Sequence, residues 1–183
     1  MATMRVDAAR NLELVLTTAA RLLARDPSTS IAAIAAEAGV DRRTVYNRFD
    51  SRETLLAAIY QARLDAVEKA VDDARLTEAP VAVALHRYVE GIISATRMWP
   101  VELERMRADT EIRDRRGDII QRVADFIQRA IDEGVFRADL PKGWIESLLR
   151  HIVHVAAHEH PEIEAAQAAD FVVDSLLRGA GQT

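Results

Sequence analysis

Apolar side chains recur every three or four residues along most of this chain, and this spacing gathers them on one face of an α-helix. No segment alternates apolar and polar residues in the manner of a β-strand. The pattern predicts helices at about residues 7–25, 31–38, 41–49, 50–75, 81–98, 101–108, 119–134, 142–158 and 162–178. The expected fold class is therefore all-α, with about nine helices.

Prolines and charged residues separate the predicted helices. Pro27, Pro80 and Pro161 each lie between two of them, and Pro141 is well placed to open one. The charged segment at residues 109–118, DTEIRDRRGD, is expected to form a turn.

The stretch Ile31–Phe49 predicts a helix-turn-helix. Its first helix ends at Gly39, where a glycine tolerates a positive φ and lets the backbone reverse. Ser30 and Asp41 are the expected N-caps of the two helices, because short polar side chains accept hydrogen bonds from the first free amides. Two helices joined in this way can place the second in the DNA major groove.

The second of these helices carries side chains suited to DNA. Arginine can form two hydrogen bonds with a guanine edge and asparagine with an adenine edge, while a threonine can contact a thymine methyl. We expect base contacts from Arg42, Arg43, Thr44 and Asn47, and mainly phosphate contacts from Thr29, Ser30, Tyr46, Arg48 and Arg52. The alternatives are a helical hairpin with a solvated arginine face and, for Arg52, an ordinary solvated first-turn residue.

Charge is distributed unevenly. The formal net charge is −5, yet residues 1–50 hold seven arginines against six acidic residues, whereas residues 51–183 hold 17 basic and 23 acidic residues. A polyanion is therefore attracted to the N-terminal part and repelled by the remainder.

The chain has no cysteine, which excludes disulfides, thiol catalysis and cysteine-based zinc fingers. No stretch approaches the ~18 uninterrupted apolar residues of a membrane span, and the N-terminus lacks a signal-length apolar run. We expect a cytoplasmic protein without a membrane partner.

Residues from about Leu12 to Ile59 resemble the tetracycline-repressor (TetR) family of bacterial transcriptional regulators. The resemblance rests on AARLLAR and on SIAAIAAEAGVDRRTVYNRFDSRETLLAAIY. It implies that Tyr46 and Arg52 contact phosphates. Arg43, Arg48 and Arg52 stand where glycine or alanine, histidine and lysine are common in the family, so the operator sequence stays open.

The resemblance also implies a helix-turn-helix DNA-binding domain over residues 1–52. A long fourth helix would link it to a helical bundle for ligand binding and dimerisation over residues 53–183. Homodimers of this kind form through the last two helices, and residues 142–158 and 162–178 both carry the apolar faces this requires. Two recognition helices would then meet a palindromic double-stranded operator about one DNA turn apart.

By the same resemblance, a small-molecule effector would bind in the bundle and release a repressor from DNA. Aromatic and methionine side chains make adaptable apolar walls, so the candidate lining residues are Tyr60, Leu64, Tyr88, Ile92, Met98, Trp99, Met106 and Phe126. Plain core packing is the alternative for each. The effector, and whether the protein represses or activates, stay open. No cofactor is expected.

His151, His154 and His158 share one helical face. Zinc ligation is one interpretation, and the lining of a dimer seam, a pocket wall or a pH-sensitive interface is the other. We expect no metal. An enzyme is the competing class, but no glycine-rich phosphate loop or nucleophile elbow is present. A module that kept the fold and lost DNA binding is the third possibility.

Overall fold

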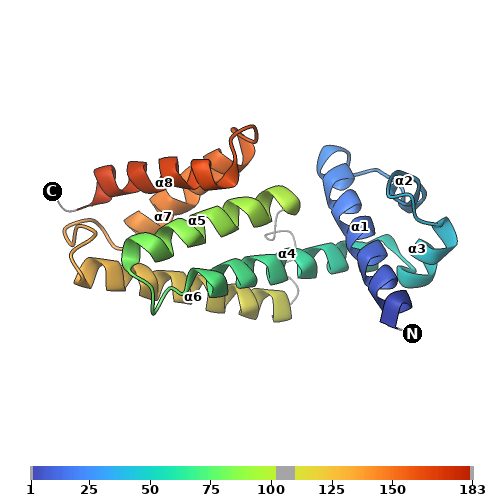
Figure 1. The fold of residues 1–183 in the computed structure, drawn as a ribbon, viewed down its shortest axis with the longest axis horizontal. Helices are drawn as coiled ribbons and strands as arrows, with labels where there is room; N and C mark the ends of the chain where they lie inside the picture. The colour runs from blue at the N-terminus through green and yellow to red at the C-terminus, as the bar shows by residue number, and fades with distance from the viewer. Residues whose placement is uncertain (1, 102–109, 182–183) are drawn as a thin grey trace. The chain divides into compact units, whose positions relative to one another are not determined.

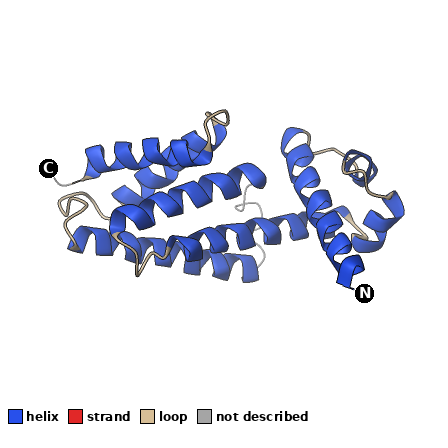
Figure 2. Ribbon diagram, viewed as in Figure 1, coloured by secondary structure: helices blue, strands red, loops and turns tan. Residues whose placement is uncertain are grey.

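The computed structural model describes residues 2–101 and 110–181, with residues 2–9 described by their backbone alone. These described residues form eight helices and no β-strand (Figures 1 and 2). The helices are α1 (Ala2–Arg25), α2 (Ile31–Glu37), α3 (Arg42–Arg48), α4 (Arg52–Ala74), α5 (Val81–Met98), α6 (Thr110–Asp132), α7 (Trp144–His158) and α8 (Ala165–Ala180). The all-α prediction is confirmed. The short helix expected at 101–108 falls almost entirely outside the described residues.

The helices form two compact units. The first takes the described residues of Met1–Arg63 and of Met98–Met106, and the second those of Leu64–Arg97 and of Arg107–Thr183. The division falls within α4, and the domain boundary expected after residue 52 stays a prediction.

In the first unit, α1 packs on α2, and α2 packs on α3. One apolar core lies between these helices and the start of α4, because each helix turns its apolar stripe inward. Its buried side chains include Val15, Leu16, Ala19, Ile34, Val45, Phe49, Leu55 and Ile59. This core determines which side of α3 faces outward.

The second unit is a helical bundle in which α7 packs against both α6 and α8. Its core is built from buried aliphatic and aromatic side chains of every helix in the unit, among them Leu64, Leu85, Ile93, Ile112, Phe126, Leu149 and Leu176. Phe136, in the loop after α6, is also fully buried and pairs with Gly181 in an isolated antiparallel bridge.

The start of α6 corrects one prediction. Residues 110–118, expected to be a charged turn, form the first part of this helix. Ile112 is buried, and Arg115 reaches acidic residues of α4. The charges at this end of α6 therefore face another helix as well as solvent, and that partnership is invisible in the local sequence.

Three other helix starts also differ from prediction, and α1 begins at Ala2 rather than near residue 7. Helix α7 begins at Trp144 rather than near residue 142, because Gly143 has a φ of 79° and Trp144 donates to the Pro141 carbonyl in a turn. Helix α8 begins at Ala165 rather than near residue 162, after an extended Glu164.

Arginine side chains hold two of the turns in the second unit. The guanidinium of Arg97, on α5, donates to the carbonyls of Ala156, His160 and Ile163 at 2.8, 2.9 and 2.6 Å, across the turn between α7 and α8. Arg129, on α6, donates in the same way to two carbonyls of the loop between α4 and α5. Both groups therefore bind main-chain carbonyls of turns, and only the Ala156 carbonyl belongs to the last turn of a helix.

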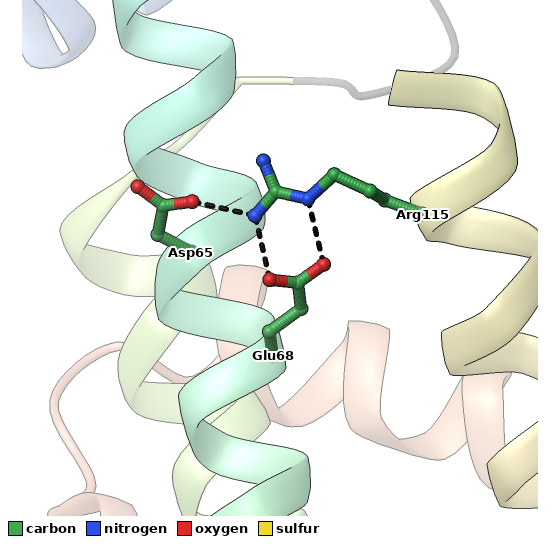
Figure 3. Close-up of polar contacts among 3 residues, drawn as sticks. All are labelled: Asp65, Glu68 and Arg115. Atoms are coloured by element: carbon green, nitrogen blue, oxygen red, sulfur yellow. Dashed lines mark hydrogen bonds and ion pairs between the residues drawn. The ribbon is translucent and has the colours of Figure 1, made fainter. Parts of the chain in front are cut away.

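An ion cluster joins α4 to α6 (Figure 3). Arg115 Nε lies 2.8 Å from Glu68 Oε1, and its Nη2 lies 2.6 Å from both Glu68 Oε2 and Asp65 Oδ1. The bidentate hydrogen bond from Arg115 lowers the pKa of Glu68 below its usual value. The cluster therefore favours folding while Glu68 is ionised.

Replacing Arg115 by glutamine is expected to lower the free energy of unfolding by about 1–2 kcal/mol at pH 7, because it removes a charge-assisted pair that is less than one-third exposed. The pKa of Glu68 is lower in the folded state, so its contribution is present at neutral pH and is lost as the pH falls below about 4. Urea unfolding at pH 7 and pH 3, followed by circular dichroism, measures both effects.

Arg113→Gln is the matched control, since Arg113 is an exposed residue of the same helix that forms an ion pair with its neighbour Asp114. A difference between wild type and Arg115→Gln that stays the same at both pH values would contradict the proposed role of Glu68.

Candidate nucleic-acid interface

The turn between α2 and α3 has the geometry expected from the sequence. Ser30 Oγ accepts a hydrogen bond from the Ala33 amide at 3.1 Å, and Asp41 Oδ1 accepts from the Arg43 and Thr44 amides at 2.8 and 3.2 Å. Both predicted N-caps are confirmed. Gly39 lies between the two helices with a φ of 65°, a conformation that costs glycine little.

Two buried residues orient α3. Val45 and Phe49, one helical turn apart, are only 2% and 5% exposed. Because they point into the core, the other side chains of the helix face away from it. Six of the predicted DNA-binding residues are thereby exposed on one short helix: Arg42, Arg43, Thr44, Tyr46, Asn47 and Arg48.

Arg42 and Tyr46 contact each other on this surface. The Arg42 guanidinium lies over the Tyr46 ring, 5.1 Å from its centroid, in a cation–π arrangement. Such stacking narrows the conformations open to both side chains. The tyrosine hydroxyl stays available to donate to a phosphate oxygen.

Arg52 is engaged within the protein. Its Nη1 donates to the Thr29 carbonyl at 2.7 Å, and its Nη2 donates to the Pro27 carbonyl. The Thr29 hydroxyl in turn donates to the Asp26 carbonyl at 2.8 Å. The predicted phosphate-contacting residues Thr29, Ser30 and Arg52 are thus close together, but the guanidinium of Arg52 holds a loop.

Asp26 was not among the predicted site residues. Its carboxylate accepts hydrogen bonds from the hydroxyl and the amide of Ser28, at 2.6 and 2.8 Å, and these lower the pKa of Asp26. The spacing of an aspartate two residues before a serine is an Asx-turn signal, and this signal was available in the sequence.

The candidate ligand-lining residues fall in both units. In the first, Tyr60 and Trp99 are buried, whereas Met98 is 53% exposed. In the second, Leu64 and Phe126 are buried, and Tyr88 and Ile92 are half-buried. Met106 lies outside the described residues. A polar surface hollow between α4 and α6, lined in part by Glu68, Asp72 and Arg122, contains none of these candidates.

The predicted histidine face lies on the exposed side of α7. His154 and His158 stack with ring centroids 4.3 Å apart, and His158 Nδ1 lies 3.1 Å from the His154 carbonyl oxygen. His151 Nδ1 lies 2.6 Å from the carbonyl oxygen of Ser147. Among the described residues, no group of three or more histidine or acidic side chains has the geometry of a metal site.

None of the helices in the described part of the chain combines the length and the apolarity that crossing a membrane requires. The feature that defines the protein is instead the first unit, with a capped helix-turn-helix and an exposed basic second helix. The class it defines is that of helix-turn-helix DNA-binding proteins.

Known proteins resemble this chain most specifically in its helix-turn-helix. Residues 15–59 match the sequence model of the bacterial regulatory proteins of the tetR family. The HTH-type transcriptional repressor LfrR of Mycolicibacterium smegmatis is 27% identical over 176 residues, covering 93% of this chain and 90% of the repressor. The predicted resemblance to the TetR family is confirmed over residues 15–59, and the relative that resembles most of this chain is a transcriptional repressor rather than an enzyme.

Solved structures share the fold. The TetR-like regulator LfrR from Mycobacterium smegmatis, in complex with proflavine, is 25% identical with a TM-score of 0.72, and the match covers 96% of this chain and 99% of that one. The ketosteroid transcriptional regulator KstR2 of Mycobacterium tuberculosis is 22% identical with a TM-score of 0.78, covering 95% and 96%.

Proposed function

We propose that this regulator is a ligand-responsive repressor that binds a palindromic operator as a homodimer and is released by a small-molecule effector. The observation that carries the proposal is the exposed face of α3, which is oriented by buried Val45 and Phe49 and capped by Asp41. The similarity to a transcriptional repressor supports repression rather than activation. Because the target is bacterial DNA, we place the protein in the cytoplasm.

At the operator, α3 enters the major groove. Base contacts come from Arg42, Arg43, Thr44 and Asn47, and phosphate contacts come mainly from Ser30, Tyr46 and Arg48. Thr29 joins them only when its hydroxyl leaves the Asp26 carbonyl. The exposure of the six α3 side chains in this set supports the assignment. Ser30 suits a phosphate contact, because its oxygen accepts from the Ala33 amide while its hydroxyl proton stays free to be donated.

Arg43→Ala is expected to weaken operator binding by about 1–3 kcal/mol per subunit and to relax selectivity at one base pair, since it removes a bidentate base contact. Fluorescence anisotropy with the DNA flanking the protein's own gene, compared with scrambled DNA, measures both quantities.

Arg87→Ala is the control for loss of positive charge, because Arg87 is exposed on α5 in the other unit. Equal weakening by the two variants, or unchanged selectivity in Arg43→Ala, would count against base recognition by Arg43.

Dimerisation through α7 and α8 is supported by their exposed apolar side chains. The pair packs together through buried residues such as Leu149 and Leu176, yet Trp144 and Phe171 are each 55% exposed, and Val155 is exposed as well. One helix pair cannot cover both of its apolar sides. A second copy, related by a two-fold axis, would cover the outer side in a four-helix interface.

Phe171→Asp is therefore expected to shift the protein from dimer to monomer, because it places a carboxylate in the apolar interface. Sedimentation equilibrium measures the shift, and operator binding should fall with it. Val83→Asp, a substitution of an exposed apolar residue on α5, should leave the dimer intact. A Phe171→Asp variant that stays dimeric would contradict this interface.

Ligand response is supported by Tyr88 on α5. Burial raises the pKa of Tyr88 to about 12, so the phenol stays neutral at physiological pH. No hydrogen bond to its hydroxyl is found within the described residues. A phenol hydroxyl without a partner among the described residues suits a polar group on an otherwise apolar ligand. The proflavine bound by a relative makes this planar aromatic compound a suitable probe.

Proflavine is expected to raise the dissociation constant of the wild-type protein for its operator, and Tyr88→Phe is expected to reduce that effect without changing DNA affinity in the absence of ligand. A ligand can release DNA only if it binds the DNA-incompetent state more tightly. Titration calorimetry followed by anisotropy separates the two steps. Tight proflavine binding with no change in operator affinity would contradict ligand-driven release by this compound.

A further inference from the structure

Hydrogen bonds order the loop between α1 and α2. Asp26 organises it by accepting hydrogen bonds from Ser28 on its carboxylate and from Thr29 on its carbonyl. Arg52 closes the loop from outside by donating to the Pro27 and Thr29 carbonyls. Two nitrogens of one planar group thus bind two carbonyls that lie two residues apart.

This arrangement requires the planar guanidinium of an arginine. A guanidinium carries several donors in a fixed plane, so it can bind two separate carbonyls at once, whereas the ammonium of lysine is a single point donor. Arg52 is also the first residue of α4, so the same hydrogen bonds tie the α1–α2 loop to the start of that helix. The position of Thr29 and Ser30 therefore depends on Arg52.

We propose that Arg52 is a positioning residue for DNA binding. By holding the α1–α2 loop, it places the Ser30 hydroxyl for its phosphate contact, and it does not supply a phosphate contact itself. This inference rests on the proposed operator contacts and replaces the phosphate role expected for Arg52 from its resemblance to the family.

Two substitutions separate the roles. Arg52→Lys keeps the positive charge but loses the planar guanidinium, and Arg52→Gln loses both. If Arg52 positions the loop, both variants bind operator about tenfold more weakly than wild type, because each loses a charge-assisted hydrogen bond. The slope of log affinity against log salt concentration should stay at the wild-type value, since no phosphate contact is lost.

Arg48 provides the matched comparison. It is exposed at the end of α3 and has no side-chain partner within the described residues. As a phosphate contact, it should tolerate lysine, and Arg48→Gln should reduce the salt slope by about 0.9 per subunit. Wild-type affinity of Arg52→Lys, or a slope reduced in Arg52→Gln as in Arg48→Gln, would overturn the positioning role.

Amide hydrogen exchange in the free protein tests, without DNA, whether Arg52 holds the α1–α2 loop. Arg52→Lys should speed exchange of the Thr29 amide, which donates within the loop, and leave the Ala38 amide at the end of α2 unchanged. Unchanged exchange at Thr29 would overturn the proposal. If the wild type does not bind DNA, the proposed operator contacts are wrong. The exchange measurement still decides in that case whether Arg52 holds the loop.

Discussion

Backbone carbonyls at the turns impose the constraint on which this fold depends. Carbonyls at a helix end and in the turn that follows it lack helical partners, and a partly buried carbonyl without a donor is costly. Arg52, Arg97 and Arg129 supply the donors for the α1–α2 loop, the α7–α8 turn and the α4–α5 loop respectively. In each case the guanidinium comes from a helix distant in sequence. Arginine side chains therefore stabilise the turns of this fold, in addition to forming the basic surface of α3.

Helix α3, which carries the proposed DNA-binding side chains, depends on the rest of the fold for its stability. Helix α3 has seven residues, and an isolated helix of that length is unstable in water. It is held by the Asp41 cap at one end and by Val45 and Phe49 in the core. These three residues leave every other side chain of α3 free of a packing role. The basic and polar residues of α3 can therefore be changed to suit a different DNA sequence without loss of the fold.

Local signals explain which features could be predicted. The N-caps Ser30 and Asp41, the reversal at Gly39 and the inward Val45 depend on neighbours within four residues, so the sequence alone predicts them correctly. The start of α6 could not be predicted in the same way. Its charged residues resemble a solvated turn until Arg115 is placed beside Glu68, 47 residues earlier in the chain. Periodicity contains no information about such a partner.

The sequence by itself determined the helical fold class, the helix-turn-helix and the side chains available to DNA, because helix periodicity, capping and turn chemistry are local properties. Only the tertiary structure decided what Arg52 contacts. Its partners, the Pro27 and Thr29 carbonyls, are main-chain groups that any residue type could offer, and they come within reach only after α1, α2 and α4 pack around a common core. In the structure, Arg52, which was predicted to contact a phosphate, therefore holds a loop.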